Sequence, residues 1–311
     1  MTTDRDRPWH GVTVATALPL TDDLSIDLDG YAAHCRGLLD GGCDGVVPNG
    51  SLGEYQTLTP QERARVVETA VAAVGGDRVM PGVAAYGATE ARRWAEQARE
   101  AGCGAVMLLP PTVYRADERA VVEHYREVAA AGLPVVAYNN PHDTRVDLTP
   151  DLLARLYGEG LIVAVKEFSG DVRRAYRIAE LAPGLDLLAG ADDVLLELAV
   201  AGAVGWVAGF PNALPGPCAA LYRAAVAGDL ATALPLYRAL HPLLRWDSAT
   251  VFVQAVKLSM DLAGLRGGPC RPPRLPLSPE QEAAVREATL RALTVTGALT
   301  VTGEGTEKEG R

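Results

Sequence analysis

A lysine stands where a buried strand is expected to end. The stretch "LIVAVKEFSGD", residues 161–171, opens with small apolar residues and brings Lys166 directly after them. An ammonium group is among the most costly groups to remove from water. Burial lowers the pKa of a lysine, and the neutral amine can then attack a ketone and form an imine. Such an imine draws electrons from the adjacent carbon, so carbon–carbon cleavage or loss of water becomes possible without a metal or cofactor.

Position alone leaves two other interpretations of Lys166 open. Its long side chain can carry the ammonium group from a strand end to solvent, or it can form an ion pair with the neighbouring Glu167. Other residues of reactive type are needed to decide between these interpretations and the imine hypothesis.

Two further stretches place reactive groups directly after apolar runs. Tyr138 lies in "AYNNP", and its phenol has the chemistry to carry a proton to or from an imine-forming substrate. Ser51 lies in "PNGSLGEYQTL" between two glycines. Glycines permit a tight turn that aims backbone N–H groups and a hydroxyl at one point, as a bound carboxylate requires.

The elements that must position these residues alternate along the chain. Amphipathic stretches such as "PQERARVVETAVAAVGG" separate short apolar runs, and Thr59 with Glu62 predicts a capping box at the start of that helix. "TPDLLARL" repeats the Thr-Pro helix start. The eight apolar runs are "VTVATALPL", "GVVPNGS", "RVMPGVAAY", "GAVMLLPP", "LPVVAYNNP", "LIVAVKEFS", "LDLLAGADD" and "VGWVAGFPN".

Strands that alternate with helices predict a parallel α/β fold. Eight such units favour a closed (β/α)₈ TIM barrel, in which the carboxyl ends of the strands build the active site. An open doubly wound sheet is the alternative, but that fold usually carries a GxGxxG turn after its first strand, and "VATALPLTDD" has none. In the barrel, Ile162, Ala164 and Lys166 are predicted to share one face of the sixth strand.

The apolar runs stop after about residue 228, and three amphipathic segments follow. We therefore predict a barrel over residues 1–228, a C-terminal helical extension over residues 229–296 and a disordered tail over residues 297–311. The expected helices lie in "LATALPLYRALHPLLRW", "ATVFVQAVKLSMDLAGL" and "SPEQEAAVREATLRAL".

The composition limits the possible partners. Of the 311 residues, 48% are apolar and 22% are charged, and the formal net charge is −10 with no basic run. These values argue against nucleic acid and anionic membrane surfaces and favour small molecules. No apolar stretch approaches the roughly 20 residues of a membrane span, and the start of the chain is polar, so we expect a cytoplasmic protein.

Cysteines and histidines show no metal-binding pattern. The five cysteines are scattered without CxxC spacing, and the five histidines form no HExxH motif. This arrangement is typical of reduced thiols in a cytosolic protein, so we expect neither a metal site nor a cofactor.

Three of the stretches together resemble the motifs of a known family. "GSLGE" at 50–54, "YNNP" at 138–141 and "VKEFSGD" at 165–171 are similar to the GxxGE, YNxP and K-x-x-S-G-D signatures of the dihydrodipicolinate synthase and N-acetylneuraminate lyase family. Their order and spacing match, and the resemblance extends over the barrel, the "GADD" stretch and the C-terminal helices. It implies a class I Schiff-base lyase or aldolase acting on pyruvate or a substituted 2-oxo acid, assembled as a homotetramer or dimer.

The resemblance also implies roles for individual residues. Lys166 corresponds to the imine-forming lysine, and Tyr138 corresponds to the acid/base. Ser51 and the amide of Leu52 would receive the substrate carboxylate, while Val207 would lie against the bound oxo acid.

Departures from the dihydrodipicolinate synthase pattern bear on the substrate. Leu52 stands where the synthase has the second threonine of its proton relay, and Val113 stands where its interface tyrosine is expected, with Tyr114 one residue later. Asp143 replaces the arginine that binds the semialdehyde carboxylate. Arg145 is a candidate for binding another anionic tail, and a surface ion pair of Arg145 with a nearby aspartate is the alternative.

Three functions stay open at this point. The departures favour enzymes that cleave, dehydrate or deaminate hydroxylated oxo acids over 4-hydroxy-tetrahydrodipicolinate synthase of lysine biosynthesis, which remains the second candidate. A non-catalytic oxo-acid-binding barrel belongs to another class, since a fold does not determine a function. A nicotinamide-dependent reductase would require a dinucleotide site, for which the sequence shows no motif.

Overall fold

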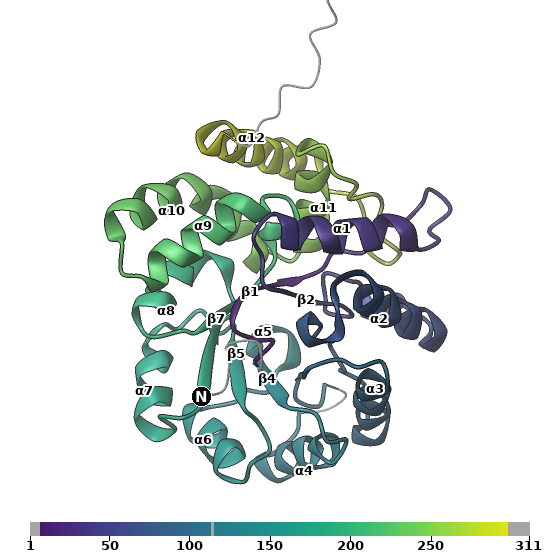
Figure 1. Ribbon diagram of the computed structural model, residues 1–311, viewed down its shortest axis with the longest axis vertical. Helices are drawn as coiled ribbons and strands as arrows, with labels where there is room; N and C mark the ends of the chain where they lie inside the picture. The colour runs from purple at the N-terminus through teal and green to yellow at the C-terminus, as the bar shows by residue number, and fades with distance from the viewer. Residues whose placement is uncertain (1–6, 113–114, 298–311) are drawn as a thin grey trace, which may run out of the picture.

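The computed structural model describes residues 7–112 and 115–297, and these form a parallel α/β barrel (Figure 1). All strand pairs are parallel, and the order across the sheet is β2-β1-β7-β6-β5-β4-β3. The strands in these ranges are β1 (Gly11–Ala15), β2 (Gly45–Val47), β3 (Val106–Leu108), β4 (Val135–Asn139), β5 (Ala164–Glu167), β6 (Asp186–Ala189) and β7 (Gly205–Ala208). The predicted TIM-barrel fold class is confirmed, with one wall segment that differs from a regular strand.

That segment is the third apolar run, "RVMPGVAAY", where the sequence predicted a strand. Val79 forms a parallel bridge with Val46 of β2, and Gly82 forms one with Met107 of β3. Pro81 lies between the two bridges and has no N–H to donate, so a continuous ladder cannot form. The run thus joins β2 to β3 and nearly closes the barrel by isolated bridges, which explains why seven regular strands are seen where eight were expected.

Helices surround the sheet and follow the strands in turn (Figure 1). The predicted capping box between Thr59 and Glu62 is present at the start of α2, and Thr149 caps α6 through its side chain. The outer helices are α1 (Leu28–Asp40), α2 (Pro60–Val74), α3 (Ala88–Glu100), α4 (Glu118–Ala129), α6 (Pro150–Gly158), α7 (Arg173–Leu181), α8 (Leu195–Val200) and α9 (Pro215–Val226). A short helix, α5 (Pro141–Thr144), follows β4 directly.

The three helices expected after the barrel are confirmed. They are α10 (Leu230–Leu244), α11 (Phe252–Leu262) and α12 (Pro279–Thr296), and Figure 1 shows them gathered on one side of the barrel next to α9 and α1. The boundary near residue 228 stays a prediction, and the tail expected to be disordered lies, after Gly297, outside the described residues. Among the described residues, no helix is long and apolar enough to cross a membrane.

Two hydrophobic cores follow from the alternation of side chains along the strands. Tyr138 and Ala164 belong to the cluster inside the barrel, whereas Val165 packs in the larger cluster between sheet and helices. Ala164 and Lys166 therefore share the inner face as predicted. Ile162 was expected on that face too, but it precedes β5 and packs in the outer cluster, so this part of the prediction was wrong.

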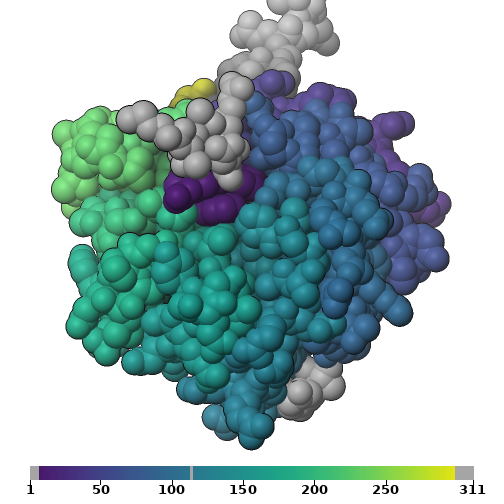
Figure 2. All heavy atoms as spheres, turned by 60° about the horizontal axis from the view of Figure 1, so that its bottom comes forward, coloured from purple at the N-terminus to yellow at the C-terminus, as the bar shows by residue number. Residues whose placement is uncertain are grey.

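The N-terminal segment closes the end of the barrel opposite to Lys166. Trp9 packs in the inner cluster, and its Nε1 donates to Asp186 at the start of β6 over 2.8 Å. Arg7 pairs with the same carboxylate at 3.0 Å. Figure 2 shows this purple start of the described chain lying among green and blue segments that are distant in sequence. Access to the barrel interior therefore lies at the carboxyl ends of the strands.

Candidate active site

Lys166 and Tyr138 are direct neighbours on adjacent strands. The register of β4 and β5 pairs Tyr138 with Lys166, and both side chains point into the barrel. The Lys166 Nζ atom lies 4.4 Å from the centroid of the Tyr138 ring and 5.7 Å from that of Phe168. Their relative exposures are only 6% for Lys166 and 7% for Tyr138. The structure thus brings together the amine and the phenol that the sequence singled out.

Burial shifts the protonation equilibria of both groups. Desolvation lowers the pKa of Lys166, while the carboxyl groups of Asp247 and Asp192 act in the opposite direction. For Tyr138, burial raises the pKa, and Asp247 adds to this effect. A lowered lysine pKa favours the neutral, nucleophilic amine, and a raised tyrosine pKa keeps the phenol protonated as a donor.

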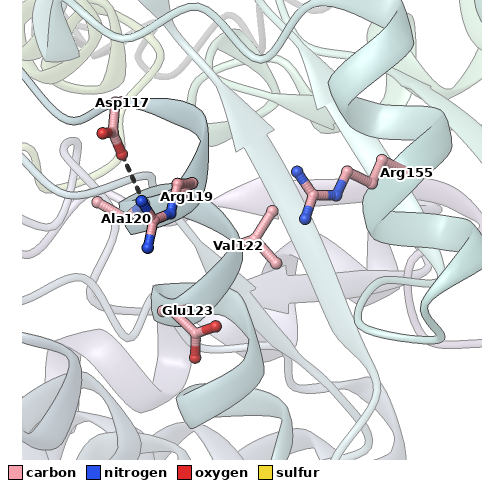
Figure 3. A pocket seen from close by; sticks show the side chains of 6 residues that line it. All are labelled: Asp117, Arg119, Ala120, Val122, Glu123 and Arg155. Carbon is pink, nitrogen blue, oxygen red and sulfur yellow. Dashed lines mark hydrogen bonds between the residues drawn. The ribbon is translucent and has the colours of Figure 1, made fainter.

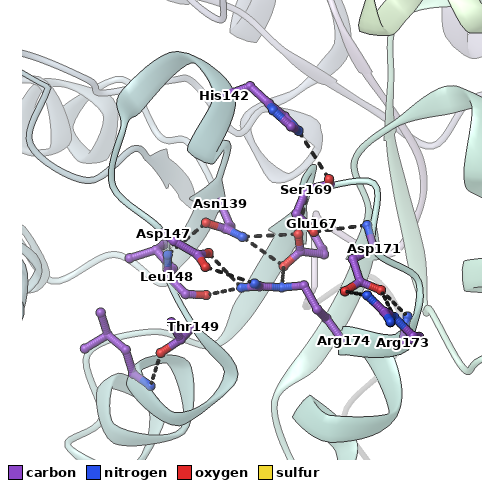
Figure 4. Close-up of polar contacts among 11 residues, drawn as sticks. Asn139, His142, Asp147, Leu148, Thr149, Glu167, Ser169, Asp171, Arg173 and Arg174 are labelled. Carbon is purple, nitrogen blue, oxygen red and sulfur yellow. Dashed lines mark hydrogen bonds and ion pairs between the residues drawn. The ribbon is translucent and has the colours of Figure 1, made fainter.

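Neither alternative interpretation of Lys166 fits the structure. Lys166 is only 6% exposed, so its ammonium group does not reach open solvent. Glu167 points to the other face of β5, where it accepts hydrogen bonds from Asn139 Nδ2 at 3.0 and 3.1 Å and pairs with Arg174 at 3.2 Å. Figure 4 shows this network around Glu167 and Arg174.

The turn that carries Ser51 forms, but its geometry differs from the expectation. The left-handed backbone conformations are at Asn49 (φ 55°) and Glu54 (φ 52°), not at the two glycines beside Ser51. Glu54 is held by Lys257, whose Nζ lies 2.7 Å from Oε1. This ion pair ties α11 to the turn, and the strain of a left-handed glutamate is offset by that buried contact.

The other predicted site residues fall into different environments. Leu52 is 3% exposed and Val207 is fully buried in the inner cluster, while Ser51 is half-buried. Arg145 is exposed and ends α5 in a left-handed conformation with φ 58°. Ion pairs among the described residues do not include Arg145, so the alternative surface pair is not seen; Asp147 pairs with Arg174 instead.

Residues near the expected relay are only partly described. Val113 and Tyr114 lie outside the described residues. Asp143 is exposed, and its Oδ2 accepts from Asn140 Nδ2 at 2.9 Å. The same Nδ2 lies 3.3 Å from the Tyr138 hydroxyl, so Asn140 bridges the phenol and Asp143.

Sequence reasoning missed two buried carboxyl groups that face Lys166. Asp192 is fully buried, and Asp247 is 8% exposed. Burial raises the pKa of both groups, that of Asp247 to about 6, and Lys166 opposes the shift in each case. The "GADD" stretch was a signal for Asp192, but no motif marked Asp247, which comes from the C-terminal helical part of the chain.

A surface pocket lies away from these residues (Figure 3). Its lining comes from α4 with its capping residue and from α6, and it includes none of the strand-end residues. The lining residues are Asp117, Arg119, Ala120, Val122, Glu123 and Arg155. This shallow, polar hollow has no group with the chemistry of Lys166, and we do not assign the active site to it.

Within residues 7–112 and 115–297, no cluster of three or more His, Cys, Asp or Glu side chains has an arrangement that could hold a metal ion. The groups found at the candidate site are the amine of Lys166, the phenol of Tyr138 and the carboxyl groups of Asp192 and Asp247.

A nearly closed parallel barrel with an amine and a phenol at the carboxyl ends of neighbouring strands defines a barrel enzyme that uses side-chain chemistry. A sequence model of the Dihydrodipicolinate synthetase family matches residues 8–292. The chain belongs to this family, and it is a lyase of the dihydrodipicolinate synthase type acting on a small molecule.

Individual relatives agree with the family match. The chain is 35% identical over 292 residues to a 4-hydroxy-tetrahydrodipicolinate synthase of Methanothrix thermoacetophila, covering 93% of this chain and 99% of the relative. The solved 4-hydroxy-tetrahydrodipicolinate synthase of Methylacidiphilum fumariolicum is 27% identical with a TM-score of 0.88, over 94% of this chain and 99% of that one. YagE, a prophage protein of E. coli K12 solved in complex with pyruvate, is 26% identical with a TM-score of 0.85, over 91% and 98% of the two chains.

Proposed function

We propose that the protein is a class I lyase or aldolase in which Lys166 forms an imine with pyruvate or a hydroxylated 2-oxo acid. The observation that carries this proposal is the buried amine of Lys166, with its lowered pKa, beside the phenol of Tyr138. The amine nitrogen bonds to C2 of the oxo acid, and the ketone oxygen leaves as water. The resulting iminium ion accepts the electron pair of a breaking bond at C3.

Tyr138 is the proposed proton carrier for these steps. Its hydroxyl is within hydrogen-bonding distance of Asn140, and its ring lies over the amine. A phenol with a raised pKa donates a proton to the departing oxygen and recovers one from the carbon acid afterwards. Neighbouring strand positions keep the two groups at a constant separation, as acid–base catalysis requires.

The substrate carboxylate is proposed to bind at the turn after β2. Ser51 supplies a hydroxyl and Leu52 a backbone N–H, and Val207 would lie against the carbon chain of the oxo acid. Support comes from the half-buried position of Ser51 and the location of Val207 inside the barrel. Arg145, exposed beyond α5, is the proposed contact for an anionic tail of the substrate.

The trapping of an imine tests this function. The protein is incubated with pyruvate and borohydride, and the intact protein is weighed before the modified peptide is mapped. We expect one permanent adduct on Lys166, and none in the matched variant Lys166→Arg, because a guanidinium stays protonated. If no 2-oxo acid gives an adduct, the chain is an oxo-acid-binding barrel without catalysis.

The second candidate is 4-hydroxy-tetrahydrodipicolinate synthase itself. The name of the Methanothrix relative favours it, whereas Asp143, at the position of the expected arginine, opposes it. Two carboxylates about 4 Å apart repel each other by roughly 4 kcal/mol at an effective dielectric constant of 20, so aspartate semialdehyde would bind poorly there. A coupled assay with dihydrodipicolinate reductase decides between the candidates. Efficient condensation, with kcat/KM of about 10⁴ M⁻¹s⁻¹ or more, would favour the synthase.

We also infer that the enzyme works in the cytoplasm as a homotetramer or dimer. The absence of a membrane-spanning helix among the described residues and the acidic composition are compatible with this inference, and the family resemblance supports the assembly. Sedimentation equilibrium at micromolar concentration measures the assembly directly, and a monomer would contradict it.

A further inference from the structure

Asp247 is a buried carboxyl group that takes no part in the steps proposed for Lys166 and Tyr138. It lies in a short 3₁₀ turn, η6 (Arg245–Ser248), which connects α10 with α11. Its charge nevertheless acts on both Lys166 and Tyr138. The C-terminal helical part of the chain thus places a carboxyl group at the open end of the barrel, beside the reactive amine.

The hydrogen bonds of Asp247 differ from those of its neighbour Asp192. Asp192 accepts hydrogen bonds from Trp206 Nε1 at 2.9 Å, from Phe210 N at 2.9 Å and from Gly209 N at 3.1 Å. Both of its carboxyl oxygens therefore already have donors within the protein. For Asp247, the described part of the chain supplies one long contact, from the Asp192 N–H to Oδ2 at 3.4 Å. Its Oδ1 atom has no donor there and keeps its capacity to accept a hydrogen bond from a ligand.

The free oxygen lies next to Gly209 and close to Leu52. A Cβ atom placed on Gly209 would come within 2.5 Å of Asp247 Oδ1 and within 3.3 Å of Leu52 Cδ1. Oδ1 therefore sits against the backbone just after β7, next to the turn proposed to hold the substrate carboxylate. A ligand held between Lys166 and Leu52 has Asp247 as its neighbour on this side.

The charges of the site limit which ligand group can face Asp247. A second carboxylate would meet Asp247 as a like charge in a partly desolvated place, which opposes binding. An ammonium group would add a positive charge beside the iminium ion formed on Lys166. A hydroxyl group is neutral and donates a hydrogen bond to the free Oδ1 atom, so it satisfies the carboxylate without either repulsion.

We infer that Asp247 accepts a hydrogen bond from a hydroxyl group of the substrate, and that the enzyme thereby selects hydroxylated 2-oxo acids over those that lack the hydroxyl group. This inference rests on the proposed function, because it assumes an oxo acid held as an imine on Lys166. It assigns Asp247 a role in specificity, separate from the acid–base role of Tyr138.

A matched pair of ligands tests the inference. Borohydride trapping is measured at increasing concentrations of 4-hydroxy-2-oxopentanoate and of 2-oxopentanoate, and adducts of the intact ligand and of its cleavage product are counted together. In the unmodified enzyme, we expect the hydroxylated ligand to reach half-saturation at a concentration about 10- to 100-fold lower than the other ligand, as expected for one hydrogen bond to a charged group. Asp247→Ala should remove most of this preference.

Two further variants separate specificity from structure. Asp247→Asn keeps an acceptor oxygen and should retain part of the preference. Asp229→Asn changes a carboxylate that caps α10 in the same helical part of the chain, where asparagine caps equally well, and it should leave the preference unchanged. Thermal unfolding of each variant checks that the fold is intact.

The outcomes distinguish the inference from the proposed function. Equal losses of trapping for both ligands in Asp247→Ala would show that Asp247 acts on Lys166 and not on the hydroxyl group, which overturns the inference while the imine stands. Absence of any adduct in the unmodified enzyme would overturn the proposed function, and the inference with it.

Discussion

Two buried lysines of this protein have opposite surroundings. Lys257 on α11 is 2% exposed, and its Nζ donates to Glu54 at 2.7 Å and to the carbonyl of Pro269 at 2.6 Å. Lys166 on β5 is 6% exposed, and its Nζ lies over the faces of two aromatic rings, those of Tyr138 and Phe168. One ammonium group has its hydrogen-bonding partners in place, whereas the other faces aromatic rings and two carboxyl groups that act from farther away.

The difference shows how one residue type serves stability in one place and chemistry in another. A buried charge with a close partner is strongly held, because breaking the pair leaves an uncompensated ion. A buried amine without such a partner loses its proton more easily, because desolvation disfavours the charged form. The environment of Lys257 therefore supports the turn of Ser51, and that of Lys166 favours the neutral amine that the proposed imine requires.

Replacement of Lys166 should have the largest effect. We expect Lys166→Ala to lower turnover by at least about four orders of magnitude, since the covalent intermediate cannot form. The far-ultraviolet circular dichroism of the variant should match that of the unmodified protein, because a single strand-end side chain is truncated. Undiminished turnover of a 2-oxo acid substrate would show that Lys166 is a structural lysine like Lys257.

Removal of the Tyr138 hydroxyl should have the next largest effect. Tyr138→Phe keeps the ring that faces Lys166 but removes the proton carrier, so turnover should fall by about two to four orders of magnitude. Adduct formation with pyruvate and borohydride should be impaired less than turnover. If steady-state kinetics show normal turnover, Tyr138 only packs against the amine.

Replacement of Lys257 should lower the stability of the fold. Lys257→Met removes the close cation of the buried Glu54 and leaves only the longer ion pair with Arg274 Nε at 3.8 Å, so we expect the free energy of unfolding to fall by about 3–5 kcal/mol. Urea denaturation followed by tryptophan fluorescence measures this change. The double variant with Glu54→Gln should recover much of the loss, since no uncompensated charge remains. An unchanged denaturation midpoint in the single variant would refute the assigned difference between the two lysines.

A partly exposed ion pair should give the smallest effect. Arg271 lies against Glu62, and its hydrogen bonds hold the pKa of that carboxyl at about 2, below the ordinary value of 4.5. A lowered pKa in the folded state stabilises the protein above about pH 4.5, and this contribution disappears as the pH falls toward 2. After allowance for solvent screening, we expect about 1–2 kcal/mol.

Acid unfolding of two glutamine variants measures that contribution. Glu62→Gln should flatten the decrease in stability between pH 4.5 and 2, within the range that the folded protein tolerates. The matched control is Glu282→Gln, which removes an exposed i,i+4 pair with Arg286 on α12. An equal change in both variants would mean that the contact of Glu62 with the C-terminal part of the chain adds nothing beyond a surface pair.

Much of the fold was predictable because its causes are local. Alternation of apolar runs with capped helices indicated a parallel barrel, and the period of two along a strand placed Ala164 and Lys166 on one face. The same reasoning failed for Ile162, since it cannot tell where a strand begins. It also failed at the third wall segment, where one proline is enough to interrupt the ladder.

The sequence by itself determined which strand ends carry the amine of Lys166 and the phenol of Tyr138, because each ends its own apolar run. Only the tertiary structure decided that Asp247 faces the same site and that Lys257 reaches Glu54. These contacts join the C-terminal helices to turns far away in the chain, and no periodicity or motif encodes them. They arise because the C-terminal helices pack beside the barrel and bring Asp247 to Asp192 and Lys257 to Glu54, and the burial of these groups shifts their protonation equilibria or requires an ion-pair partner.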